Sequence, residues 1–194
     1  LPKFIVSIKL NTVYNSKEMV NNTPLYSVRL GLESSGWLLN KFSYLLNAGY
    51  DTSLLAYKLF GVPYSQFYRG DIEVRYNFKI DPYKSFATRF YGGAALPYQN
   101  STRTGIPFEK RFFVGGTNDL RGWRIRKIGP GSYYYDDTLD FYKAGDYKLM
   151  INGEYRSSFY KTLSYAVFFD AGNVWTFKKE SGKPGDAAFV RCKR

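Results

Sequence analysis

The segment Gln66 to Ile80 constrains the fold most, because it alternates apolar and charged residues over its whole length. One set of alternate positions is apolar or aromatic, and the other is almost entirely charged, with both signs present. A period of two places the two sets on opposite faces of a β-sheet. Strands of globular proteins average about five or six residues, so this one is unusually long. A soluble sandwich strand with its polar face in water remains an alternative.

The same alternation recurs elsewhere in the chain. It is clear at 26–33, 147–156 and 163–175, and weaker at 3–14 and 86–95. Alternation in strands flanked by aromatic residues is typical of outer-membrane barrels, whose strands need only about 9–11 residues. The pattern predicts an all-β fold, an antiparallel transmembrane β-barrel. The aromatic residues expected in its interfacial girdles are Tyr68, Tyr76, Tyr98, Tyr147 and Trp175.

The expected connections alternate in length, as they do in such barrels. Short turns are predicted at 81–83 and 160–161, and longer loops at about 34–62, 97–105, 115–145 and 178–186. A short helix is predicted within the first long loop. The pattern gives about seven strands and a doubtful eighth at 186–194. Since bacterial single-chain barrels close with even strand numbers, we expect the chain to be a fragment of a longer one.

Composition argues against several classes of function. The sequence has no His and a single cysteine, Cys192, which excludes Ser-His-Asp and Cys-His catalysis and removes the usual zinc ligands. We therefore expect no metal, no cofactor and no enzymatic activity. The net charge of +12 would suit nucleic acid or anionic lipid. Charges at alternate strand positions are unlike a nucleic-acid-binding tail, so nucleic acid is not an expected partner.

The segment Phe112 to Tyr135 breaks the strand pattern, because glycine and proline punctuate it too often for a strand or helix. Its core, "GGTNDLRGWRIRKIGPGS", resembles the signature loop of the BamA/TamA family of outer-membrane assembly factors. "IPFEKRFFVGG" resembles the strand that leads into that loop, and "FFDAGNVW" resembles a further family motif. The residues matching the loop signature are Gly115, Gly116, Leu120, Arg121, Gly122, Trp123, Gly129 and Pro130.

The resemblance implies that the loop folds back into the barrel, where Arg121 meets acidic side chains of the next two strands. The matching acids are Glu154 and Asp170, and parity alone places both on the inward, polar face. An arginine facing two carboxylates away from bulk water makes charge-assisted hydrogen bonds. We therefore expect the loop to be an internal strut, with Trp123 packed on the wall.

The resemblance also implies the organisation and role of the chain. Residues 1–194 would form a partial barrel domain, about the seventh to the thirteenth of sixteen strands, with a loop at about 115–145 folded inward and the periplasmic POTRA domains absent from this chain. "LYSVRLGLESSGWLL" is similar to Bacteroidetes-type members. The implied function is an insertase or translocase of the bacterial outer membrane, with nascent outer-membrane proteins, outer-membrane lipids and accessory assembly subunits as partners. TamA-like translocation of lipids or autotransporters and a passive porin-like channel are the alternatives.

Overall fold

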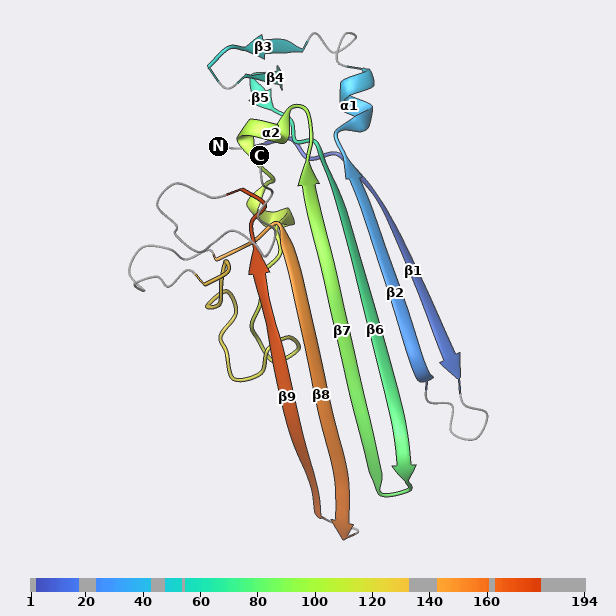
Figure 1. Cartoon of the computed structure of the whole chain (residues 1–194). Helices are drawn as coiled ribbons and strands as arrows, with labels where there is room; N and C mark the ends of the chain where they lie inside the picture. The colour runs from blue at the N-terminus through green and yellow to red at the C-terminus, as the bar shows by residue number, and fades with distance from the viewer. Residues whose placement is uncertain are drawn as a thin grey trace, which may run out of the picture.

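Six long strands build one antiparallel sheet, drawn as a tall wall in Figure 1. The computed structural model describes residues 3–17, 24–42, 48–53, 55–132, 143–160 and 163–178. In this part of the chain the sheet has the order β1-β2-β6-β7-β8-β9 and is open between β1 and β9. The predicted all-β, antiparallel class is confirmed, and the wall is consistent with part of a barrel. Its strands are β1 (Ser7–Lys17), β2 (Pro24–Ser35), β6 (Phe67–Asp81), β7 (Lys84–Pro97), β8 (Tyr147–Tyr160) and β9 (Leu163–Trp175).

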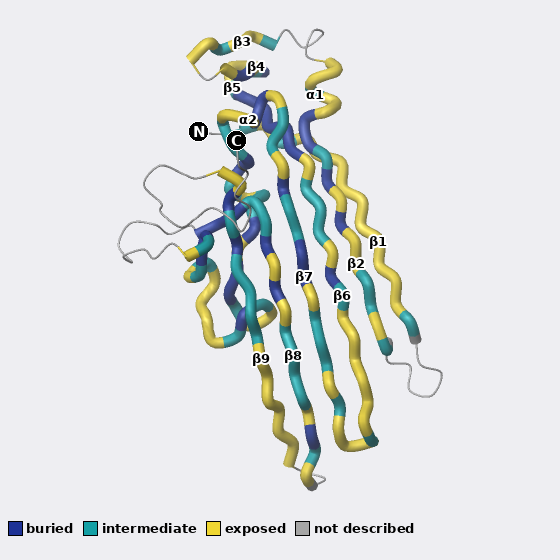
Figure 2. Tube along the Cα trace, in the orientation of Figure 1, coloured by how far each residue is buried: buried dark blue, intermediate teal, exposed yellow. Residues whose placement is uncertain are grey.

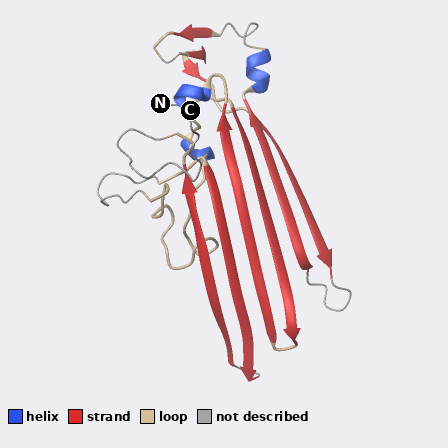
Figure 3. Cartoon of the chain, viewed as in Figure 1, coloured by secondary structure: helices blue, strands red, loops and turns tan. Residues whose placement is uncertain are grey.

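The shorter elements gather at one end of the wall, as Figure 3 shows. Helix α1 (Trp37–Lys41) confirms the short helix predicted in the first long loop. It is followed by a small sheet of β3 (Gly49–Asp51), β4 (Ala56–Leu59) and β5 (Val62–Pro63). Helix α2 (Ser101–Thr104) and the 3-10 helix η1 (Phe108–Lys110) lie between β7 and β8. Among the described residues, none of the helices has the length and apolar character needed to cross a membrane.

The strand predicted at 106–116 is wrong. This segment contains η1 and continues without regular structure, apart from an isolated bridge between Phe112 and Gly145. The reason is that Ile106, Phe112 and Val114 are buried in a core formed with the sheet. These apolar side chains pack on the wall, whereas a strand of the wall would have carried them to its lipid face.

A single long connection, residues 98–146, therefore joins the neighbouring strands β7 and β8. The loops predicted separately at 97–105 and 115–145 are both parts of it. Among the described residues the wall has six long strands, where about seven strands were predicted for the chain. The doubtful eighth strand at 186–194 and, apart from Lys178, the loop predicted at 178–186 lie outside the described residues.

One face of the wall is continuously apolar. The register pairs apolar residues across neighbouring strands, so that Val74 faces Phe90 and Phe90 faces Ile151. Exposure is high along this face, reaching 45% for Phe90 and 67% for Phe169. Figure 2 shows exposed residues along all six strands. Soluble proteins rarely expose apolar patches above a few hundred Å², so this face is suited to contact lipid.

Aromatic residues flank the apolar face, as expected for interfacial girdles. At the loop end, Tyr68 stacks on Tyr98 with ring centroids 4.5 Å apart, and Tyr147 stacks on Trp175 at 5.2 Å. Tyr76 follows Tyr68 by eight residues on the same face of β6. Eight residues of strand span about 26 Å. This span is comparable to the apolar band of about 25 Å in outer-membrane barrels.

The opposite, inner face is not uniformly polar. Near the loop end it contributes apolar residues to a core, including Met150, which is 2% exposed although parity had grouped it with polar residues. The connection between β7 and β8 covers this core. The cluster consists of Phe67, Tyr91, Ala95, Ile106, Phe112, Val114, Leu120, Met150 and Val174.

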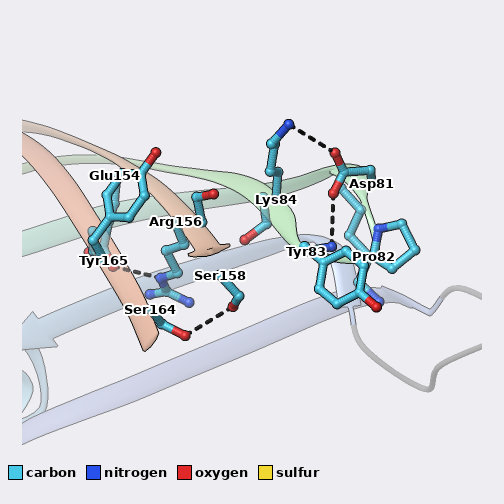
Figure 4. A pocket seen from close by; sticks show the side chains of 13 residues that line it. Asp81, Pro82, Tyr83, Lys84, Glu154, Arg156, Ser158, Ser164 and Tyr165 are labelled. Atoms are coloured by element: carbon cyan, nitrogen blue, oxygen red, sulfur yellow. Dashed lines mark hydrogen bonds and ion pairs between the residues drawn. The ribbon is translucent and has the colours of Figure 1, made fainter. Parts of the chain in front are cut away.

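Figure 4 shows the turn between β6 and β7 from close by. The backbone N–H of Tyr83 donates to the Asp81 carboxylate at 2.8 Å, and Lys84 pairs with the same carboxylate at 3.4 Å. These contacts confirm the short turn predicted at 81–83. The other short turn, predicted at 160–161, reaches residue 161, which lies outside the described residues. A cavity of about 720 Å³ lies between this turn and the end of the β8–β9 hairpin.

Candidate functional site

The loop 115–126 doubles back on itself at backbone positions that only glycine adopts readily. Gly115 has φ of 105°, and a Cβ on it would lie 2.3 Å from the carbonyl oxygen of Arg124. Left-handed φ values of this kind favour glycine. Two backbone bonds close the loop: Gly116 N donates to Trp123 O at 2.9 Å, and Arg126 N donates to Val114 O at 2.9 Å. The folded loop carries Arg121 at its tip.

Arg121 reaches two adjacent strands at once. Its Nε donates to Asp170 Oδ2 and its Nη2 donates to Asp170 Oδ1, both at 2.8 Å. Its Nη1 donates to Glu154 Oε2, and its backbone N–H donates to Asp170 Oδ2 at 3.0 Å. Asp170 belongs to β9 and Glu154 to β8. We call these three residues the Arg121 clamp; its bidentate geometry is the strongest form of such a pair.

The clamp is largely withdrawn from solvent. The side chain of Asp170 is 4% exposed, that of Glu154 is 18% exposed and that of Arg121 is 27% exposed. The hydrogen bonds that Arg121 donates to Asp170 and, to a smaller extent, to Glu154 raise the pKa of its guanidinium. Burial acts in the opposite direction and lowers this pKa. The arginine therefore remains charged at any physiological pH.

Each acid of the clamp has a further partner on the wall. Asn152 Nδ2 donates to Asp170 Oδ1 at 2.8 Å. Arg156 Nε donates to Glu154 Oε1 at 2.6 Å, and both of these side chains are labelled in Figure 4. The carboxylates are thus held in place by their own sheet before the loop arginine meets them. Such preorganisation lowers the conformational entropy lost in forming the clamp.

Sequence reasoning missed one contact of Arg121. The guanidinium lies 4.0 Å from the ring centroid of Phe168, in cation–π geometry. Phe168 occupies an inward position two residues before Asp170, paired with Glu154 in the register. The sequence did carry a signal for this contact, because Phe168 is an aromatic residue at one of the alternate positions of β9 that face inward and are otherwise mostly polar.

Each of the remaining signature residues either packs in the core or allows a backbone conformation that other residues rarely adopt. Leu120 is 3% exposed and belongs to the core cluster. Gly122 has φ of 89° with open space around it, so glycine serves its backbone conformation alone. At Gly129 both the backbone conformation and the close packing require glycine, because its φ is 78° and an added Cβ would lie 2.7 Å from Asn173 Oδ1. Pro130 beside it is buried.

The prediction that Trp123 packs on the wall is wrong, since its side chain is 59% exposed. The chain turns at this point, with Trp123 N donating to Leu120 O at 3.3 Å. Leu120 and Arg121 make the contacts with the sheet, whereas Trp123 is exposed. A tight turn cannot direct all of its side chains to the same surface.

The geometry describes a fixed structural tie. Both clamp carboxylates are occupied by arginine donors, and among the described residues there is no group of three His, Cys, Asp or Glu side chains that could hold a metal ion. The tie joins the loop to β8 and β9, so moving the loop away from the sheet would expose two paired carboxylates. The clamp therefore holds the loop against these two strands.

Comparison with known proteins identifies the family. No curated protein matched the chain. The Omp85 superfamily domain matches residues 34–190, most of the chain, including β6 to β9 and the whole Arg121 clamp. This match agrees with the BamA/TamA-like resemblance of the loop. Proteins of this superfamily are in general outer-membrane proteins that act in membrane-protein insertion and translocation. The chain belongs to the Omp85 superfamily.

Proposed function

We propose that this chain is the barrel part of a non-enzymatic insertase or translocase that assists the folding and insertion of outer-membrane β-barrel proteins. The observation that carries the proposal is the Arg121 clamp. It fixes an inward-folded loop to β8 and β9 through one guanidinium and two carboxylates. The chemistry needed is strand pairing, which requires no catalytic residue.

The physical reason lies in the cost of open strand edges. Each unpaired backbone group in lipid costs several kcal/mol. A client strand can satisfy such groups by pairing with the edge, as in β-augmentation. A barrel that keeps one labile seam for clients needs compensating stability elsewhere in its wall. The core under the loop supplies that stability along β6 to β9, and the clamp keeps the loop in place over this core.

A passive channel is the rival from a different class. It is suggested by the charged inner positions near the turn end, such as Arg75 and Arg156, whose side chains are 58% and 61% exposed. Against it, Phe112, Val114 and Leu120 pack directly on the inner face near the loop end. A packed core at that level would obstruct an aqueous pore.

The test uses the full-length protein reconstituted in liposomes, with Arg121→Ala compared with Arg124→Ala. Arg124 is an exposed arginine of the same loop and serves as the matched control. We expect the wild type and the control to insert an added eight-stranded barrel client, and Arg121→Ala to lose most of this activity. In planar bilayers the wild type should show a small, erratic conductance.

Two outcomes would overturn the proposal in different ways. A large, steady conductance together with no client insertion by the wild type would favour the passive channel. Normal barrel insertion with loss of autotransporter or lipid translocation would favour the TamA-like alternative. In either case the clamp would still be a structural tie, but its role in general barrel assembly would be refuted.

A further inference from the structure

Asp119, two residues before Arg121, makes a second ionic contact between the loop and the wall. Its Oδ1 accepts a hydrogen bond from Lys148 Nζ at 2.6 Å. Its Oδ2 accepts from the backbone N–H of Gly115 at 2.9 Å. One carboxylate thus closes the loop on itself and ties it to β8.

Lys148 depends on the loop for its hydrogen-bond acceptors. It is an inner-face residue of β8 and is 8% exposed. Its ammonium also donates to Phe113 O at 3.0 Å and lies 5.0 Å from the ring centroid of Tyr91. The carboxylate and the carbonyl oxygen both come from the connection between β7 and β8. A buried ammonium is costly unless it is paired and hydrogen-bonded, so Lys148 favours the loop in this position.

The second contact is linked to the clamp through Asn152. Asn152 Nδ2 donates both to the backbone oxygen of Asp119 at 2.7 Å and to Asp170 Oδ1 at 2.8 Å. Lys148, Asn152 and Glu154 all occupy inward positions of β8. This row contacts loop residues 119 and 121 in order. A shift of the loop by one residue along β8 would separate Asp119 from Lys148 and Arg121 from Glu154 at the same time.

We propose that Asp119 and Lys148 form a positioning pair that sets the register of the loop on β8 and so brings Arg121 to Glu154 and Asp170. The pair acts through the clamp and has no contact with a client. Neither Asp119 nor Lys148 is among the residues matched to the loop signature in the sequence. The inference concerns loop placement and stands independently of the proposed insertase function.

The low exposure of the pair argues against an incidental surface contact. The side chains of Lys148 and Asp119 are 10% and 15% exposed, whereas exposed ion pairs usually contribute about 0–1 kcal/mol. The chain also offers a matched control. Lys110 of η1 pairs with Glu33 of β2, whose side chain is 3% exposed. That lysine–carboxylate pair ties the base of the same connection to the wall, far from the loop tip.

The experiment measures loop position in the full-length protein in liposomes by the distance between two spin labels. The labels are placed at Thr117, exposed in the loop, and at Thr12, exposed on β1, after Cys192→Ser. We expect a single narrow distance in the unsubstituted protein. Asp119→Asn should broaden this distance or shift it by about 3 Å, the length of one residue.

Three further variants separate positioning from stability. Lys148→Arg should keep the wild-type distance, and Lys110→Met should leave it unchanged. The double variant Asp119→Asn with Lys148→Met leaves no unpaired charge, so its melting temperature should recover above that of Asp119→Asn. Its loop distance should nevertheless remain displaced, because the register contact is gone.

Two results would overturn the inference. One is an unchanged distance in both Asp119→Asn and the double variant. The other is a double variant that recovers the wild-type distance together with its stability, which would make the pair a stabilising contact with no positioning role. Neither result involves client insertion, so a failure of the insertase proposal would be recognised separately.

Discussion

Replacing Arg121 by alanine is the most direct perturbation of the strut. The substitution removes three side-chain hydrogen bonds to Asp170 and Glu154 and the contact with the Phe168 ring. It keeps the backbone hydrogen bond from residue 121 to Asp170. The loop glycines and the buried Leu120 are untouched, so the loop should still be able to fold.

The size of the destabilisation caused by Arg121→Ala depends on which hydrogen-bond partners Asp170 and Glu154 keep. Removing one partner of a fully buried ion pair costs about 3–5 kcal/mol. Here Asp170 keeps Asn152 and Glu154 keeps Arg156, and Arg121 itself is 27% exposed. Solvent screening and these remaining partners reduce the cost. We expect Arg121→Ala to lower the free energy of loop opening by about 2–4 kcal/mol.

Hydrogen–deuterium exchange of the full-length protein in liposomes measures this free energy locally. The reporters are the amides of Gly116 and Arg126, which donate within the folded loop. At about 1.4 kcal/mol per tenfold, their protection should fall roughly 30- to 700-fold in Arg121→Ala. Protection of strand amides in β8 should change far less. Arg124→Ala, in the same loop, should leave all of these values unchanged.

The reasoning would be refuted by either of two results. A loss of protection below about threefold, under 1 kcal/mol, would mean that the guanidinium does not hold the loop. An equal loss in the loop and throughout β8 would mean that the loop and the wall unfold as one unit. In that case the clamp would stabilise the whole barrel, with no separate effect on the loop.

Two further predictions follow from the same contacts. Asp170→Ala should lower the melting temperature in detergent micelles more than Glu154→Ala, because Asp170 accepts more hydrogen bonds and is less exposed; the reverse order would contradict the geometry. Gly93→Ala should destabilise the loop by about 1–3 kcal/mol, because its Cβ would lie 2.7 Å from the Phe112 ring. Gly153→Ala, with 3.9 Å of clearance, is its control, and equal protease sensitivity of the two variants would count against the packing argument.

Much of the wall was predictable because strand alternation is a local property. In β6 the charged positions alternate with apolar ones over the whole strand, and the structure places the two sets on opposite faces. Parity also placed Glu154 and Asp170 on the face that Arg121 approaches. That Arg121 would be the residue to meet them came from the resemblance of the loop. Its contact with both acids is present in the structure.

The failed predictions concern contacts between residues far apart in the chain. Apart from Pro107, the local pattern of 106–114 does not distinguish it from a strand, because its apolar residues suit a lipid-facing strand as well as a core. Trp123 likewise has no local feature that predicts its exposure. The pairing of Asp119 with Lys148 joins residues on a loop and a strand that come together only when the connection folds over β8.

The sequence by itself determined which residues lie on each side of the sheet, since a period of two follows from the covalent geometry of an extended backbone. Only the tertiary structure decided what each part of the inner side meets. Near the loop end Met150 and Val174 are buried under the loop, and towards the turns Arg75 and Arg156 stay exposed. The physical reason is that parity gives a direction, whereas burial depends on which distant segment fills the space in that direction.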